Sequence, residues 1–156
     1  MFERSEANPI PSDAGTYCLW IRLDAPLSLT VGRLGERTLP PGLLVYVGSA
    51  LGPGGLRARV GRHLRADKTL RWHIDWLTAR VPISAVWVRT GHARLECAWS
   101  AALLQVYGAA IAWPRFGASD CACATHLIAV PDEALPAAWL ALAPEAVIGA
   151  LDGYDR

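Results

Sequence analysis

Residues 43–65, LLVYVGSALGPGGLRARVGRHLR, decide how the rest of the chain is interpreted. An apolar run that ends in Tyr46-Val47-Gly48 predicts a buried strand, and the glycine-rich turn after it predicts a tight loop. The segment that follows the turn predicts a helix with several basic side chains. A strand, a tight loop and a basic helix in this order indicate an anion site.

Composition limits where such a site lies. The chain of 156 residues fits one domain, and its formal net charge of +1 excludes a strongly basic protein that coats nucleic acid. Basic residues nevertheless gather in residues 57–71, against a single acid, Asp67. We therefore expect any nucleic-acid site to be local to this segment, and a solvated helix face is the alternative reading of the same charges.

Cysteine usage and hydropathy predict the compartment. Four cysteines do not make a disulfide-dense scaffold, and no charged leader with an apolar signal core opens the chain, so we expect a reduced, cytoplasmic protein. Charges or prolines interrupt every apolar run well short of the roughly 20 residues that a membrane span needs, which predicts no membrane segment. Residues 1–14 are expected to be a flexible arm, and residues 15–156 a single domain.

Strands are predicted from a period of two. Gly15–Leu23 and Leu27–Val31 both alternate, and we expect them to pair as a hairpin. A loop over residues 32–42 should lead into a third strand at residues 43–48. Two later apolar runs predict short strands, at residues 84–88 and 126–130.

Helices are predicted between and after these strands. The expected segments are residues 55–64, 70–79 and 93–107, followed by an alanine-rich tail, residues 133–151, that should form two short helices. The order of elements predicts an α/β (α+β) fold with at least one antiparallel hairpin and with helices on the faces of the sheet.

Several side chains suit phosphodiester chemistry. Tyr17 and Tyr46 lie near the ends of predicted strands, Arg59 and His63 share a helix face at a spacing of four, and Glu96 lies on a predicted helix. Hydrolysis needs a positive group, a base for water and often a metal held by a carboxylate. Each residue also has a structural reading: half-buried strand aromatics, a surface pair, and a first-turn carboxylate favoured by the helix dipole.

The spacing of these residues resembles the pattern of the GIY-YIG nuclease superfamily. The shared features are Gly15-Thr16-Tyr17, then Tyr46-Val47-Gly48, then an arginine with a histidine four residues on. The chain is most similar to a prokaryotic branch, the Uri-type endonuclease-like domains, in its YVGSA, WHIDWL, LEC and FGASDCACATHL segments. The resemblance covers about residues 15–104. It implies a central three-stranded antiparallel sheet flanked by helices, here with an extra C-terminal strand and helices.

The resemblance also implies an activity, namely metal-dependent cleavage of DNA with Mg²⁺ or Mn²⁺, in DNA repair or processing. By position, Tyr17 would act as the base or orient the water, and Tyr46 would support it. Arg59 would brace the scissile phosphate, His63 would assist proton transfer, and Glu96 would hold the metal. The alternative is a catalytically inactive nucleic-acid-binding module of the same fold.

Two features depart from the superfamily pattern. The glycine-rich insertion lengthens the spacing after the second tripeptide, so Arg57 competes for the arginine role, and the Arg-x-x-x-His spacing favours Arg59. Asn8 is the only asparagine of the chain. The asparagine that better-studied members carry after the glutamate helix is therefore missing, or is replaced by Ser119 or Asp120.

The other basic residues of the segment 57–71 are expected to contact the DNA backbone. His73 is expected at the rim of the site or in a tertiary hydrogen bond. The expected nucleic-acid contacts are Arg57, Arg62, Arg65, Lys68, Arg71 and His73.

A short cysteine segment raises a separate hypothesis. Cys121, Cys123 and His126, with Cys97 elsewhere in the chain, are candidate ligands of a structural zinc ion. The spacing C-x-C-x-x-H lacks the usual paired C-x-x-C, so buried thiols beside the active-site loop are the alternative.

Overall fold

The computed structural model describes residues 10–149 and 151, and these form a mixed α+β fold. Six strands form one sheet in the order β6-β7-β4-β1-β5-β8, and β2 and β3 form a separate two-stranded sheet. All of these strand pairs are antiparallel. The strands are β1 (Gly15–Leu23), β2 (Leu27–Val31), β3 (Gly35–Leu39), β4 (Gly42–Ala50), β5 (Ala85–Thr90), β6 (Ala110–Ile111), β7 (Leu127–Ala129) and β8 (Ala146–Gly149). The helices are α1 (Gly55–Leu64), α2 (His73–Thr78), α3 (Glu96–Leu104) and α4 (Leu135–Leu142), with 3-10 turns at Gly32–Leu34 and Asp132–Ala134.

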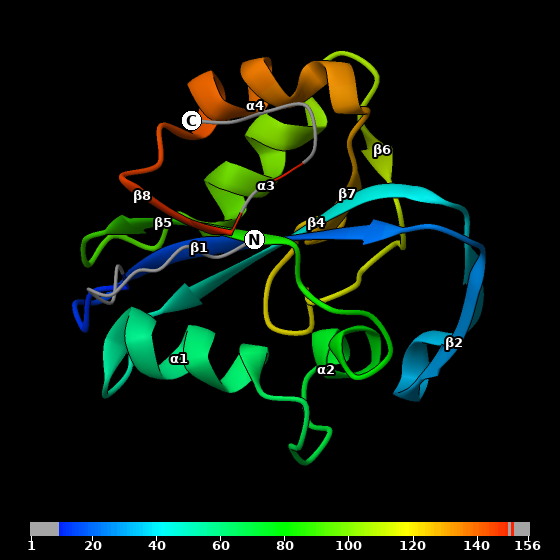
Figure 1. Cartoon of the computed structure of the whole chain (residues 1–156), viewed down its shortest axis with the longest axis horizontal. Helices are drawn as coiled ribbons and strands as arrows, with labels where there is room; N and C mark the ends of the chain where they lie inside the picture. Colours follow the sequence, from blue (N-terminus) through cyan, green and yellow to red (C-terminus); the bar gives the residue numbers. More distant parts are fainter. Residues whose placement is uncertain (1–9, 150, 152–156) are drawn as a thin grey trace.

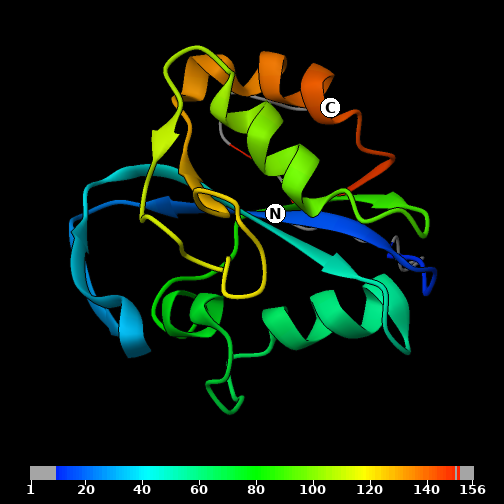
Figure 2. The ribbon, with the colours of Figure 1, turned by 180° about the vertical axis from the view of Figure 1, so that it is seen from behind.

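The elements are stacked in three layers. Helices α1 and α2 lie on one face of the six-stranded sheet, and α3 and α4 lie on the other (Figures 1 and 2). The sequence of strand β1 accounts for helices on both faces, because its successive side chains point alternately into two separate hydrophobic cores. Leu19 and Ile21 pack in the core with α1 and α2, whereas Cys18 and Trp20 pack in the core with α3 and α4. Both faces of β1 are therefore buried.

The register of the sheet places the two tripeptides, Gly15-Thr16-Tyr17 and Tyr46-Val47-Gly48, side by side. Strand β1 lies between β4 and β5, and Tyr17 pairs with Gly48 of β4 and with Val88 of β5. Leu19 pairs with Tyr46 in the same ladder. The strand predictions at Gly15–Leu23 and residues 43–48 are confirmed, and the middle of the sheet is three antiparallel strands, β4-β1-β5.

The predicted hairpin between Gly15–Leu23 and Leu27–Val31 is wrong. Strand β2 pairs with β3, which lies inside the segment predicted as a loop. Strand β3 has the sequence GERTL, and Leu39 is its only buried residue. Because three of its residues are exposed and polar, it shows no apolar alternation from which a strand could be predicted.

The predicted second helix of the tail is also wrong. Helix α4 ends at Leu142, and the next residue, Ala143, adopts a left-handed conformation with φ of 48°. The chain then forms β8 at the edge of the sheet beside β5. The helices predicted over residues 70–79 and 93–107 are present but shorter, as α2 and α3. The carboxylate of Asp75 accepts the amide protons of Arg71 and Trp72, which holds the chain before α2 in a turn.

Residues 10–14, part of the expected arm, are packed against the domain. Ile10 is buried, and the carbonyl groups of Pro11 and Asp13 accept the amide protons of Arg57 and Leu56 at the start of α1. The rest of the expected arm, residues 1–9, lies outside the described residues. In the part of the chain that the structure describes, no helix has the length and apolar character of a membrane span.

Candidate active site

A cavity of about 490 Å³ opens beside the two tripeptides. Four elements that are distant in sequence contribute to its wall. The residues are Tyr17 of β1, Tyr46 of β4, Arg59 of α1 and Glu96 of α3. The structure thus brings together four of the five residues that the sequence assigned to catalysis, and the fifth, His63, contacts Tyr17 from α1.

Two glycines, Gly48 of the second tripeptide and Gly117 of the loop before β7, leave room for the tyrosines of the cavity wall. A Cβ atom at Gly48 would overlap the phenol of Tyr17, which crosses it from the neighbouring strand, and would lie 2.6 Å from Cζ. Gly117 is similarly placed, because its φ is +73° and a Cβ atom there would lie 2.8 Å from Cε1 of Tyr46. A side chain at either glycine would displace a tyrosine from the cavity wall.

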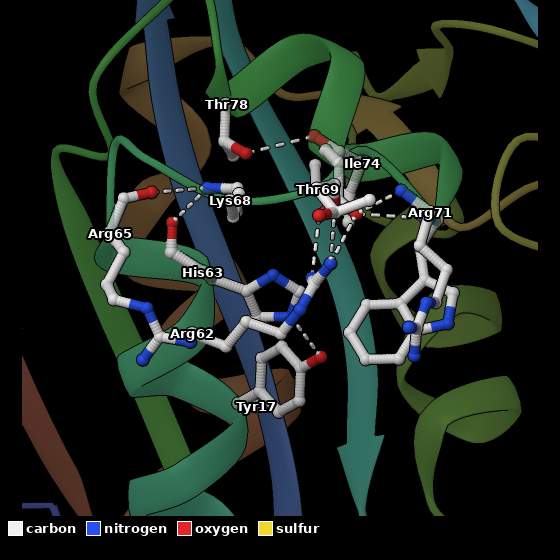
Figure 3. A network of polar contacts seen from close by, with 11 residues as sticks. Tyr17, Arg62, His63, Arg65, Lys68, Thr69, Arg71, Ile74 and Thr78 are labelled. Atoms are coloured by element: carbon white, nitrogen blue, oxygen red, sulfur yellow. Dashed lines mark hydrogen bonds and ion pairs between the residues drawn. The ribbon is translucent and has the colours of Figure 1, made fainter.

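Tyr17 and His63 form a buried polar pair. The Tyr17 hydroxyl lies 2.7 Å from Nε2 of His63, and both side chains are almost fully buried (Figure 3). Burial raises the pKa of Tyr17 far above its usual range and lowers the pKa of His63 to about 3. Both groups are therefore neutral near pH 7. Nδ1 of His63 is buried and has no hydrogen-bond partner among the described residues.

Tyr46 is the second buried phenol of the site. Its ring packs edge-on against Phe116 and lies 6.4 Å, between centroids, from the ring of His63. Burial, and then the proximity of Tyr17 and Glu96, raises the pKa of Tyr46 well above its usual value. Tyr46 is therefore a neutral hydrogen-bonding group at the cavity wall.

Arg59 provides a fixed positive charge. Its Nη1 donates to the carbonyl oxygen of Ser49 at 3.0 Å, and its guanidinium carbon lies 4.6 Å from the centre of the Trp72 ring. Arg57, the competing candidate, instead donates from Nε to the carbonyl oxygen of Ile10 and does not line the cavity. The structure therefore places Arg59, and not Arg57, at the site.

Arg62 has a structural partner. It forms a bidentate ion pair with Asp75, with both N···O distances at 2.9 Å, and Asp75 is fully buried. Burial acts to raise the pKa of Asp75, but hydrogen bonds from Arg62 and from two backbone amides outweigh it and hold this pKa below its usual value. The guanidinium carbon of Arg62 also lies 4.3 Å from the centre of the Trp72 ring. Arg62 thus ties α1 to α2.

Glu96 begins α3, and its side chain is 13% exposed. Its carboxylate lies 3.6 Å from Nη2 of Arg94, and Asp120 lines the same cavity. Mg²⁺ is usually held by one or two carboxylates, with water and substrate phosphates completing its coordination. Glu96 and Asp120 thus offer two carboxylates, the ligand type that Mg²⁺ prefers, on the wall of one cavity.

The expected DNA contacts fall into two groups. Arg71 and His73 line the cavity, and Nδ1 of His73 accepts the amide proton of Gly117 at 2.8 Å. His73 thus combines the two roles considered for it, a place at the site and a tertiary hydrogen bond. Lys68 follows α1 and donates to the carbonyl groups of His63 and Arg65 (Figure 3). The expected contacts that do not line the cavity are Arg57, Arg62, Arg65 and Lys68.

Sequence reasoning missed Arg94, which lines the cavity beside Glu96. It precedes the helix in an exposed segment, and no motif or periodicity singles it out. Ser119 and Asp120, the two replacements considered for the missing asparagine, both line the cavity.

Three of the four cysteines form a cluster with a histidine. One potential ligand atom from each of Cys97, Cys121, Cys123 and His126 lies within 4.8 Å of the others. The sequence placed Cys97 elsewhere, but the start of α3 brings it to the other three.

These features define an α+β domain with an arginine, a carboxylate and two buried tyrosines around one cavity. Residues 16–147 match the family described as domain of unknown function DUF123, and the chain belongs to this family. Comparisons with curated proteins and with solved structures gave no match.

Proposed function

We propose that the protein is a metal-dependent DNA endonuclease of GIY-YIG type, which hydrolyses phosphodiester bonds in DNA repair or processing. The observation that carries the proposal is that Tyr17, Tyr46, Arg59 and Glu96 line one and the same cavity, of about 490 Å³. These residues match the positions that the superfamily pattern uses for chemistry. Their convergence from four separate elements favours a catalytic role over four unrelated structural roles.

The Tyr17–His63 pair supplies a path for the proton of the attacking water. With the imidazole proton on Nδ1, Nε2 accepts the hydrogen bond from the Tyr17 hydroxyl. Water then gives a proton to the Tyr17 oxygen while Tyr17 gives its own proton to Nε2. The hydroxide forms the new P–O bond, the P–O bond to the leaving group breaks, and the leaving alkoxide takes a proton from solvent.

The charge of the substrate makes this transfer easier. Burial holds the pKa of His63 at about 3, and the positive charges of Arg59, Arg62 and Lys68 also disfavour the imidazolium. An anionic phosphodiester next to the site favours the imidazolium and raises this pKa. Substrate binding therefore makes His63 a better proton acceptor.

Arg59 and Glu96 act on the phosphate. The Arg59 guanidinium is held by Ser49 and Trp72, so it faces the charge that develops on the phosphoryl oxygens without having to reorganise. Glu96 would hold Mg²⁺ or Mn²⁺, and this ion would supply further positive charge to the phosphoryl group. Arg71, exposed at the edge of the cavity, would contact a neighbouring phosphate.

The proposal is tested by a cleavage screen with the purified full-length chain. Single-stranded, double-stranded and branched DNA are incubated with Mg²⁺ or Mn²⁺, and with EDTA as the control, while binding is measured in parallel. Metal-dependent cleavage of at least one form supports the nuclease. Binding without cleavage of any form identifies the catalytically inactive nucleic-acid-binding module instead, and neither binding nor cleavage contradicts both.

A further inference from the structure

We propose that Cys97, Cys121, Cys123 and His126 form a structural site for zinc. This inference is independent of the nuclease proposal, because it concerns a different set of side chains, none of which lines the cavity. It rests on the distances between the ligand atoms, on their chemistry and on the partner of the histidine.

The distances fit a tetrahedral ion. The four ligand atoms all lie within 4.8 Å of one another, and the Cys121 sulfur lies 3.3 Å from Nε2 of His126. In a tetrahedral zinc site with Zn–S bonds of about 2.3 Å, neighbouring ligand atoms are roughly 3.7 Å apart. Small side-chain movements therefore bring all four atoms onto one ion.

The donor set also selects the metal. Three sulfurs and one imidazole nitrogen are the Cys₃His set of structural zinc sites, whereas Mg²⁺ and Mn²⁺ prefer oxygen ligands. Because four protein ligands complete the tetrahedron, no position stays open for water or substrate. The site is thus of the structural and not the catalytic type.

The histidine is held in the orientation that a ligand needs. Nδ1 of His126 lies 2.6 Å from the hydroxyl oxygen of Ser100, and both side chains are almost fully buried. When Nδ1 donates its proton to Ser100, Nε2 carries the lone pair and faces the sulfur of Cys121. A hydrogen bond to the second ring nitrogen is the usual support of a metal-bound histidine.

The loop that carries the cysteines is shaped around Arg115. Its guanidinium donates to the carbonyl groups of Ala118, Cys121 and Cys123, and its own φ is +65°. Three thiolates around Zn²⁺ leave one net negative charge, which this nearby cation offsets. The loop is therefore arranged for such a site before the ion binds.

An ion at this site would join two parts of the cavity wall. Cys97 is the neighbour of Glu96 in the first turn of α3, and Cys121 follows Asp120 in the loop. Glu96 and Asp120 both line the cavity. Zinc would thus fix the loop against the start of α3.

The test begins with the metal content of the full-length chain, purified without chelators from cells supplied with zinc. We expect about one zinc per chain by mass spectrometry, in line with a closed four-ligand site. Exchange for Co²⁺ should give the intense visible bands of tetrahedral, thiolate-bound cobalt. A folded chain with neither stoichiometric zinc nor these bands, or with a disulfide among the three cysteines, overturns the proposal.

Matched variants assign the ligands. Cys123→Ser should lose zinc, whereas Ala122→Ser, at an exposed position one residue away, should keep it. Equal zinc in the two variants overturns the assignment. Ser100→Ala keeps all four ligands and should weaken zinc binding about 10-fold. If Cys123→Ser does not fold, the cobalt spectrum of the unmodified chain decides the question alone.

Discussion

Tyr17 and His63 are 46 residues apart in the sequence, yet the hydroxyl of one lies 2.7 Å from Nε2 of the other in a buried contact. Tyr17 comes from the central strand β1 and His63 from the third turn of α1, so the pair joins the sheet to the helix. Burial keeps both side chains neutral, so the pair is suited to passing a proton and not to binding a metal ion by charge.

Gly48→Ala should abolish cleavage by displacing Tyr17. The new Cβ atom would overlap the phenol, and overpacking of this kind costs about 1–3 kcal/mol of unfolding free energy. Gly61→Ala is the matched control, because a Cβ atom there meets nothing within 4 Å and Gly61 does not line the cavity. Cleavage rates and urea unfolding curves measure the two effects, and full activity in Gly48→Ala would show that the position of Tyr17 is unimportant.

Arg59→Ala should lower the cleavage rate about 10²- to 10³-fold, the usual cost of removing one electrostatic donor to the transition state. Arg57→Ala on the same helix removes an equal charge from outside the cavity, so it should affect mainly DNA binding. Single-turnover rates and binding constants for both variants separate these effects. Equal losses of rate in the two variants would contradict the role of Arg59.

His63 should make the protein less stable in acid. The unfolded chain takes up a proton at the ordinary pKa of 6.5, whereas the folded protein does so only near a pKa of about 3, so protons favour the unfolded state between these values. Above pH 6.5 His63 does not lower the free energy of unfolding. As the pH falls from 6.5 toward 3, the free energy of unfolding drops by about 1.4 kcal/mol per pH unit.

Urea unfolding from pH 4.5 to 7.5 measures this effect, as the difference between the wild type and His63→Gln. The variant should show the shallower dependence on pH, because glutamine does not titrate. His92→Gln, at an exposed position after β5, serves as the matched substitution. Parallel curves for the wild type and His63→Gln would contradict a buried, neutral His63.

Asp75→Asn should destabilise the fold by about 3–5 kcal/mol, the usual cost of breaking a buried ion pair. The carboxylate is fully buried, binds Arg62 through both oxygens and also accepts two backbone amides. Asp67→Asn, in the exposed turn after α1, should change stability by less than about 0.5 kcal/mol. The midpoint of urea unfolding compares the two, and equal midpoints would show that the ion pair adds nothing to stability.

Much of the site could be predicted from the sequence because local patterns encode it. The alternation in β1 and the apolar run of β4 reveal the strands that carry both tyrosines, and the spacing between Arg59 and His63 distinguishes Arg59 from Arg57. The ion pair between Arg62 and Asp75 was not predicted, because a partner chosen by tertiary packing leaves no periodic signal. The ion pair gives Arg62 a structural role, as a link between α1 and α2, that the sequence does not reveal.

The parts that could not be predicted depend on contacts between distant segments. Strand β3 has three exposed polar residues, so its pairing with β2 leaves no pattern in the sequence. Cys97 lies far from the Cys121–His126 segment in the sequence, and only the fold shows that α3 carries it there. The three-dimensional arrangement, and not the spacing, makes these four residues a candidate metal site.

The most direct test of the central claim is the single-turnover cleavage rate of Glu96→Gln, measured with Mg²⁺ or Mn²⁺ on a DNA form that the wild type cleaves. Glu36→Gln, on the exposed face of β3, is the matched control. We predict that Glu96→Gln loses cleavage at least about 100-fold while the folded protein still binds DNA, and that Glu36→Gln cleaves like the wild type. Wild-type rates in Glu96→Gln, or a wild type that cleaves no form of DNA, would contradict a catalytic cavity.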